Sequence, residues 1–172
     1  KLEEIQQKYH FVRAGDTVVD LGAAPGGFLQ LLSQWVGPKG KVIGVDLTPI
    51  EPISPSIITV VQDIFDLPEL EKIFTPLRCT VLTSDLAPKT TGIKEIDQER
   101  SVELNEQVLT IANRFLRPGG HVLIKIFRGH SFDLFLKRMR GFFRTVHCIK
   151  PKASRDRSRE IYILGLGLIP KK

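Results

Sequence analysis

Hydrophobic residues recur along the chain in two patterns that replace each other from segment to segment. Short continuous runs of aliphatic and β-branched residues predict buried strands, whereas apolar residues three or four positions apart predict amphipathic helices. The predicted strands are residues 17–20, 41–47, 57–61, 80–85, 121–127, 143–149 and 160–168. The predicted helices are residues 2–9, 27–36, 67–74, about 97–117 and 132–143.

The alternation of strands with helices predicts the fold class. It indicates an α/β fold in which a mostly parallel sheet carries helices on both faces. With 172 residues, of which 42% are hydrophobic, we expect one domain that spans residues 1–172. No apolar run approaches the roughly 20 residues of a membrane span, so we expect no membrane partner. Cys79 and Cys148 are far apart in sequence and no histidine lies at metal-ligand spacing, which predicts two core thiols and no metal site.

A glycine-rich turn joins the first predicted strand to the helix that follows it, and it contains Gly22, Gly26 and Gly27. Glycines let a ligand approach the backbone closely, and the first turn of a helix offers unpaired N–H groups. The spacing matches neither the dinucleotide pattern G-x-G-x-x-G nor the Lys-Ser/Thr pair of a phosphate-binding loop. The Asp20 carboxylate would repel a pyrophosphate but suits the positive charges of S-adenosylmethionine. A strand–helix turn without any ligand is the alternative.

Acidic residues close four of the predicted strands, namely Asp20, Asp46, Asp63 and Asp85. Because α/β sheets bind ligands over the carboxyl ends of their parallel strands, we expect these four side chains at one binding edge. Several carboxylates together favour a ligand that is rich in hydroxyl groups, amino groups and positive charge. An acid after the second strand suits a ribose diol, and an acid after the third suits an adenine amino group. S-adenosylmethionine fits this arrangement better than NAD does.

Lys125 stands inside an apolar run near the end of the fifth predicted strand. Burying a lysine costs free energy unless the ammonium group finds a partner. A structural lysine that is paired or reaches solvent would explain it. We favour a functional role, because the predicted carboxyl edge brings Lys125 close to Asp85.

Positive charge gathers in the last third of the chain. Residues 121–172 carry 13 Lys and Arg against 3 Asp and Glu, whereas residues 1–120 carry 12 against 16. One-sided charge of this kind favours a surface that follows a phosphate backbone, and solubilising charge is the alternative. The candidates for contact with such a backbone are Lys137, Arg138, Arg140 and Arg144 in a predicted helix, and Lys150, Lys152, Arg155, Arg157 and Arg159 in a predicted loop.

Five segments carry the motifs of the chain: 1–7 (KLEEIQQ), 20–27 (DLGAAPGG), 84–88 (SDLAP), 125–127 (KIF) and 154–162 (SRDRSREIY). In this order they resemble the FtsJ-type ribosomal RNA 2′-O-methyltransferases, over nearly the whole chain. The resemblance implies a single Rossmann-like methyltransferase domain. It also implies that the seven-stranded sheet is mostly parallel and that its last strand is antiparallel.

The resemblance assigns roles to individual residues. A Lys-Asp-Lys-Glu tetrad maps onto Lys1, Asp85, Lys125 and Glu160, in which Lys125 is either a general base or a cation that orients the ribose hydroxyl. Together with the glycine-rich turn, the expected residues for S-adenosylmethionine are Asp20, Gly22, Ala24, Pro25, Gly26, Gly27, Phe28, Asp46, Asp63 and Asp85. Phe28 stands where some relatives have tryptophan.

The resemblance implies 2′-O-methylation of a uridine in large-subunit ribosomal RNA, with that RNA or the large ribosomal subunit as partner. Transfer RNA or a messenger cap is the alternative substrate, and a non-catalytic RNA-binding assembly factor is the alternative class. We expect a cytoplasmic monomer. Because the chain begins at Lys1 and not at methionine, we also expect a missing upstream segment, which leaves a mitochondrial destination open.

Overall fold

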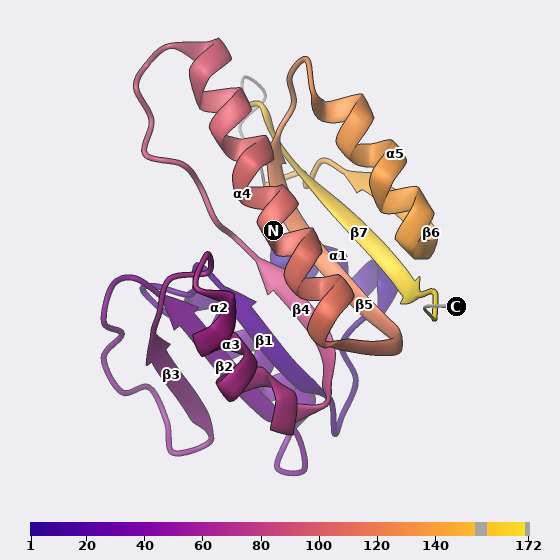
Figure 1. The fold of residues 1–172 in the computed structure, drawn as a ribbon. Coiled ribbons are helices and arrows are strands. Elements are labelled where there is room, and N and C mark those ends of the chain that lie inside the picture. The colour runs from indigo at the N-terminus through magenta and orange to yellow at the C-terminus, as the bar shows by residue number, and fades with distance from the viewer. Residues whose placement is uncertain (154–157, 171–172) are drawn as a thin grey trace.

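One seven-stranded sheet runs through the centre of the computed structural model, which describes residues 1–153 and 158–170 (Figure 1). The strands are β1 (Thr17–Leu21), β2 (Lys41–Asp46), β3 (Ile57–Val61), β4 (Cys79–Ser84), β5 (Leu116–Phe127), β6 (Phe143–Ile149) and β7 (Glu160–Leu168). Their order across the sheet is β3-β2-β1-β4-β5-β7-β6. β7 runs antiparallel to both β5 and β6, and the other neighbouring pairs are parallel. The predicted sheet, including its antiparallel last strand, is confirmed.

Helices cover both faces of the sheet, as predicted. α1 (Leu2–Tyr9) and α2 (Gly27–Val36) pack on one face, and α3 (Leu67–Phe74), α4 (Lys94–Phe115) and α5 (Phe132–Phe142) pack on the other. A short 3₁₀ turn, η1 (Thr75–Leu77), follows α3. Figure 1 shows α4 lying in front of the sheet. Among the helices of residues 1–153 and 158–170, none is long and apolar enough to cross a lipid bilayer.

Alternate residues of β5 supply the two cores. Ile124 and Ile126 belong to the cluster under α3, α4 and α5, whereas Leu123 belongs to the cluster under α1 and α2. Because side chains alternate along a strand, Lys125 leaves the sheet on the same face as Leu123. The apolar run that predicted this strand therefore supplies core residues to both faces of the sheet. Lys125 interrupts the apolar surface only on the face that carries α1.

The boundary between α4 and β5 differs from the prediction. The helix was expected to continue to about residue 117 and the strand to begin at 121, but α4 ends at Phe115 and Leu116 is already extended. Pro118 disfavours helical backbone at Arg117, the residue before it, so the helix cannot extend to residue 117. The pairing then shifts, since Cys79 lies opposite Leu116 while Val81 lies opposite His121.

The two cysteines lie in different surroundings. Cys79 is buried in the core, as predicted, but Cys148 is exposed and the expectation of a second core thiol was wrong. Cys148 lies on β6, which is an edge strand of the sheet. Alternate side chains of an edge strand meet solvent wherever no helix covers them.

Candidate active site

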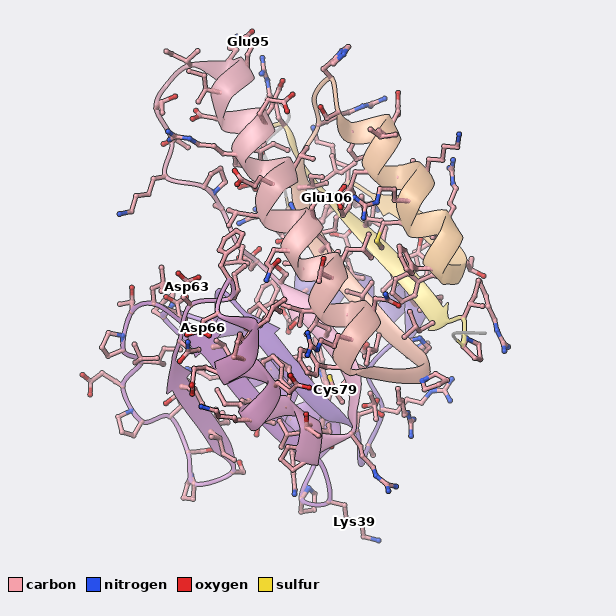
Figure 2. The ribbon with its side chains drawn as sticks, in the orientation of Figure 1. Lys39, Asp63, Asp66, Cys79, Glu95 and Glu106 are labelled. Atoms are coloured by element: carbon pink, nitrogen blue, oxygen red, sulfur yellow. The ribbon has the colours of Figure 1, made fainter. Side chains whose placement is uncertain are left out.

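A cavity of about 770 Å³ opens at the carboxyl ends of β1, β2, β3 and β4. Five residues expected from the sequence line this cavity, namely Gly22, Ala24, Asp46, Asp63 and Asp85. Its volume is in the usual range of a small-molecule site. The acids that close successive strands therefore meet at one edge of the sheet, and Asp63 is visible there just after β3 (Figure 2).

The glycine-rich turn forms one wall of this cavity. Close packing and hydrogen bonds to a carboxylate hold it in place. Gly22 has φ +75°, and a Cβ atom on it would lie 2.7 Å from Cδ2 of Leu86. Only glycine fits there without a shift of Leu86. Both oxygens of Asp46 accept backbone hydrogen bonds, one from the N–H of Ala24 at 3.0 Å and one from the N–H of Thr48 at 2.8 Å. Asp46 thereby fixes the turn to the end of β2.

Asp20 lies beneath this edge and does not line the cavity. Its side chain is fully buried, and Oδ1 accepts a hydrogen bond of 2.6 Å from the hydroxyl of Thr83. The pKa of Asp20 is raised to about 8, chiefly by burial; the Thr83 hydrogen bond opposes the shift, and the charges of Asp85 and Asp46 add to it. Within the described ranges, Asp20 Oδ2 and the hydroxyl of Ser84 have no hydrogen-bond partner.

Four other expected cofactor residues also lie outside the cavity lining. They are Pro25, Gly26, Gly27 and Phe28, which form the end of the turn and the start of α2. Gly26 is the N-cap of α2 with φ +112°, and Phe28 packs partly buried against the core under α1 and α2. These residues shape the turn, while Gly22 and Ala24 present it to the cavity.

The cavity also has an apolar wall and a helical wall that the sequence did not reveal. Leu47 and Phe65 line it although they are 69% and 50% exposed, so their apolar surface is open to a ligand. Each follows shortly after a strand-closing acid, and this position in the sequence could have indicated that it lines the cavity. Arg100, Glu103 and Leu104 of α4 line the cavity as well, and only the folded chain brings them there.

The predicted tetrad comes together as two ion pairs. Lys125 is only 8% exposed, and its Nζ lies 3.3 Å from Oδ1 of Asp85. The Nζ atom of Lys1 lies 2.9 Å from Oε2 of Glu160. Glu160 stands opposite Phe127 in the β5–β7 ladder, two residues along from Lys125 and therefore on the same face.

Tyr162 joins this group although the sequence did not single it out. It is the cross-strand partner of Lys125, and its hydroxyl donates to Oδ1 of Asp85 at 2.8 Å. Burial raises the pKa of Tyr162, and the neighbouring Asp85 charge adds to the effect, so the phenol stays protonated. The sequence did contain a signal for Tyr162: it lies two residues from Glu160, and residues two apart share one face of a strand.

Polar side chains of α4 hold the end of β5 from its other side. The Nδ2 atom of the buried Asn105 donates to the carbonyl of Lys125 at 3.0 Å, and the N–H of Phe127 donates to Oγ of Ser101 at 3.1 Å. One turn earlier, Gln98 donates to the carbonyl of Arg128 at 3.0 Å. α4 thereby fixes the backbone that carries Lys125.

The expected RNA-contact residues fall into two places. Lys137, Arg138, Arg140 and Arg144 are exposed on and just after α5, where Arg138 pairs with Glu106 of α4. Arg144 packs beside Gly167, at the other end of β7 from Glu160. Lys150, Lys152 and Arg159 lie on the Glu160 side, while Arg155 and Arg157 fall outside the described residues.

The sheet, the acid-lined cavity and the adjoining ion pairs define an α/β domain of the Rossmann-like methyltransferase class. The FtsJ-like methyltransferase family model matches residues 1–168, and the chain belongs to this family.

The chain is similar to curated proteins named ribosomal RNA large subunit methyltransferase E. That of Methanothrix thermoacetophila is 44% identical over 98% of this chain and 66% of its own length. That of Anaeromyxobacter dehalogenans is 43% identical over 97% of this chain and 64% of its own length. The chain thus spans slightly less than two thirds of these two relatives, whereas it spans 86% of the Syntrophobacter fumaroxidans protein, which is 42% identical.

Solved structures share the fold. A Plasmodium falciparum protein described as a ribosomal RNA methyltransferase has a TM-score of 0.84 at 25% identity, with 99% of this chain and 96% of that chain covered. Aeropyrum pernix fibrillarin, in complex with S-adenosyl-L-methionine, has a TM-score of 0.65 at 19% identity, with 96% and 72% covered. The second likeness concerns the fold alone.

Proposed function

We propose that this domain transfers a methyl group from S-adenosylmethionine to a ribose 2′-hydroxyl of large-subunit ribosomal RNA. The observation that carries the proposal is the position of Asp85, which lines the main cavity and also contacts Lys125 and Tyr162. A group bound in the cavity therefore lies next to a buried lysine–carboxylate pair. Membership of the FtsJ-like methyltransferase family supports the same reaction.

The cavity fits a charged nucleoside cofactor. The carboxylate of Asp46 suits a ribose diol, and that of Asp63 suits an adenine amino group, while Leu47 and Phe65 offer apolar surface to the purine. Several carboxylates on the wall also suit a cation. When bound, S-adenosylmethionine supplies an electrophilic methyl group on a sulfonium.

Lys125 and Asp85 are the groups that would position the ribose hydroxyl. As an ammonium, Lys125 orients the 2′-oxygen by a hydrogen bond, and as a free amine it accepts the hydroxyl proton. Asp85 fixes the lysine at 3.3 Å, and Tyr162 donates to the same carboxylate oxygen. In either form of Lys125, correct placement of the hydroxyl supplies a large part of the rate.

The substrate class rests on the relatives. Their names support ribosomal RNA of the large subunit, and we propose a uridine of that RNA, on free RNA or the assembled subunit, as the target. These relatives come from bacteria and an archaeon, which supports a cytoplasmic protein. We propose that it acts as a monomer.

Mass spectrometry of nucleosides tests the function. Unmodified large-subunit ribosomal RNA, large ribosomal subunits and transfer RNA are each incubated with S-adenosylmethionine and either the wild-type chain or Lys125→Ala. We expect a 2′-O-methyl nucleotide in large-subunit RNA with the wild-type chain only. Methylation of transfer RNA instead would correct the substrate, and full turnover by Lys125→Ala would contradict the proposed site.

Isothermal titration with S-adenosylmethionine provides the control for this variant. Because Lys125 does not line the main cavity, Lys125→Ala should bind the cofactor as the wild-type chain does. Cofactor binding by the wild-type chain without methylation of any RNA would instead favour an RNA-binding assembly factor.

A further inference from the structure

A second, smaller cavity of about 290 Å³ opens beside Glu160. Its walls come from Lys94, Asp97 and Gln98 at the start of α4, from Phe127 at the end of β5, and from residues 158–160. Each cavity is thus bordered by one of the two ion pairs described above. Asp85 of the Asp85–Lys125 pair lines the large cavity, and Glu160 of the Lys1–Glu160 pair lines the small one.

The small cavity presents two exposed cationic side chains to a ligand. Lys94 and Arg159 are exposed on its wall, and neither belongs to an ion pair within residues 1–153 and 158–170. α4 begins at Lys94 without a side-chain cap, so the first N–H groups of this 22-residue helix add partial positive charge. Cationic side chains and a helix N-terminus together favour an anion.

The two acids on the wall are engaged elsewhere. Oδ1 of Asp97 accepts hydrogen bonds from the N–H and the hydroxyl of Thr91, at 2.7 and 2.9 Å, which hold that oxygen toward the preceding loop. These hydrogen bonds lower the pKa of Asp97, with the backbone N–H of Thr91 as the main cause. Glu160 is neutralised by Lys1 at 2.9 Å. The carboxylates therefore leave Lys94 and Arg159 available to a ligand.

The chemistry of RNA requires an anion beside the reacting hydroxyl. In every internal nucleotide the 2′-hydroxyl is on C2′, and the neighbouring carbon, C3′, carries the 3′ phosphodiester. When the 2′-hydroxyl lies at Lys125 and Asp85, this phosphate must lie close by, outside the cofactor cavity. The small cavity adjoins the tetrad at Glu160, carries cations on its wall and lies outside the cavity proposed for the cofactor.

We propose that the small cavity binds the phosphodiester on the 3′ side of the methylated ribose, with Lys94 and Arg159 as its cationic contacts. Phe127 provides apolar contact for the adjoining nucleoside. The inference rests on the proposed RNA methylation and adds a location for the substrate backbone. In this arrangement the cofactor and the RNA occupy different cavities, which leaves the 2′-oxygen free to approach the methyl carbon opposite the leaving sulfur, as displacement requires.

Substitution of the two cations tests the proposal on turnover. We expect Lys94→Gln and Arg159→Gln each to raise KM for large-subunit ribosomal RNA about tenfold, with kcat and cofactor affinity unchanged. The slope of log KM against log salt should also fall by about 0.7–0.9 for each lost phosphate contact. Lys39→Gln is the matched control, because this exposed lysine lies far from Glu95 at the other end of the molecule (Figure 2).

A binding experiment tests the same site without turnover. Uridine 3′-monophosphate and uridine 5′-monophosphate are titrated into the isotope-labelled chain and followed by nuclear magnetic resonance. We expect the 3′-phosphate to shift the amide signals of Lys94 and Phe127, and to bind at least about fivefold tighter than the 5′-phosphate. Lys94→Gln and Arg159→Gln should abolish this preference, while Lys39→Gln should retain it.

The results separate failure of this inference from failure of the proposed function. If the wild-type chain methylates RNA but the two variants keep its KM and its salt slope, the cavity assignment is wrong and the function stands. If the wild-type chain methylates no RNA, the function is wrong, and the titration still decides whether the cavity binds a 3′-phosphate. Equal binding of both monophosphates, or shifts away from Lys94 and Phe127, would overturn the inference.

Discussion

The hydroxyl of Tyr162 donates to Oδ1 of Asp85 at 2.8 Å, the same oxygen that lies 3.3 Å from Nζ of Lys125. Asp85 is thus restrained by two partners, both on the β5–β7 pair of strands. A carboxylate with two restraints keeps a narrower range of positions than one with a single partner. Tyr162 therefore acts on the proposed reaction through Asp85 and is a positioning residue.

Tyr162→Phe should lower kcat while S-adenosylmethionine affinity stays unchanged. The ring still fills its buried site, but Asp85 loses a charge-assisted hydrogen bond of about 1.5–3 kcal/mol, so we expect a loss of roughly tenfold in kcat. Single-turnover methyl transfer measures the effect. If a folded Tyr162→Phe variant kept the wild-type kcat, Tyr162 would not be a positioning residue of the site.

Glu160→Gln should separate activity from stability. The Lys1–Glu160 pair is partly exposed, so solvent screens it and its loss should change the free energy of unfolding by less than about 1 kcal/mol. The variant also removes the charge that holds Lys1 in the tetrad, and we expect kcat to fall at least about tenfold. Urea denaturation and methyl-transfer kinetics on one preparation give both quantities. A large loss of stability with unchanged kcat would show a purely structural ion pair.

Asn105→Leu should reduce activity by weakening the support that α4 gives to β5. The change removes the donor to the carbonyl of Lys125 and leaves that buried oxygen unpaired, at a cost of about 1–3 kcal/mol. We expect lower kcat with unchanged KM for S-adenosylmethionine, because Asn105 does not line the large cavity, where we propose that the cofactor binds. Asn105→Gln, which keeps an amide donor, should recover part of the activity. Thr110→Ala, on an exposed part of α4, serves as the control.

Asp20→Asn should flatten the pH dependence of stability. Asp20 titrates at about 8 in the folded chain against an ordinary value of 3.8, chiefly because it is buried. Across that interval the folded state binds the proton more tightly than the unfolded state, so the free energy of unfolding falls as pH rises. The neutral amide lacks this term. Urea denaturation at several pH values should show the wild-type chain losing stability relative to Asp20→Asn as pH rises, and parallel profiles would contradict the raised pKa.

Arg144→Gln should affect RNA binding less than Lys152→Gln does. Arg144 lies beside Gly167, seven residues along β7 from Glu160, which is roughly 23 Å in a strand. The backbone N–H of Lys152 instead donates to the carboxylate of Glu4, one helical turn from Lys1. We expect KM for RNA to rise severalfold for Lys152→Gln only, measured at low salt where phosphate contacts are strongest. Equal effects would extend the RNA surface to the start of β6.

The sequence predicted those parts of the site that local rules determine. Asp46, Asp63 and Asp85 follow strands, and parallel strands deliver their carboxyl ends to one edge, so their meeting was predictable. Lys125 stood out as a charge in an apolar run. Arg100 could not be predicted in the same way, because a helix that is distant in sequence brings it to the cavity.

Two further differences have physical causes that periodicity does not express. Asp20 occupies a strand end like the other acids, yet full burial removes it from the cavity wall. Arg144 belongs to the basic third of the chain, yet strand length carries it away from Glu160. Charge patterns identify a class of partner, whereas the position of each contact depends on the path of the chain.

The antiparallel direction of β7 has a consequence for biosynthesis. Because β7 starts at the edge of the sheet that carries Asp85 and Lys125, Lys1 meets a partner that is 159 positions later in the chain. A nascent chain on the ribosome therefore carries every residue that lines the large cavity, all between Gly22 and Leu104, before Glu160 is synthesised. The cavity residues come first and the last member of the tetrad comes near the end of the 172 residues, so the tetrad can assemble only when almost all of them have been made.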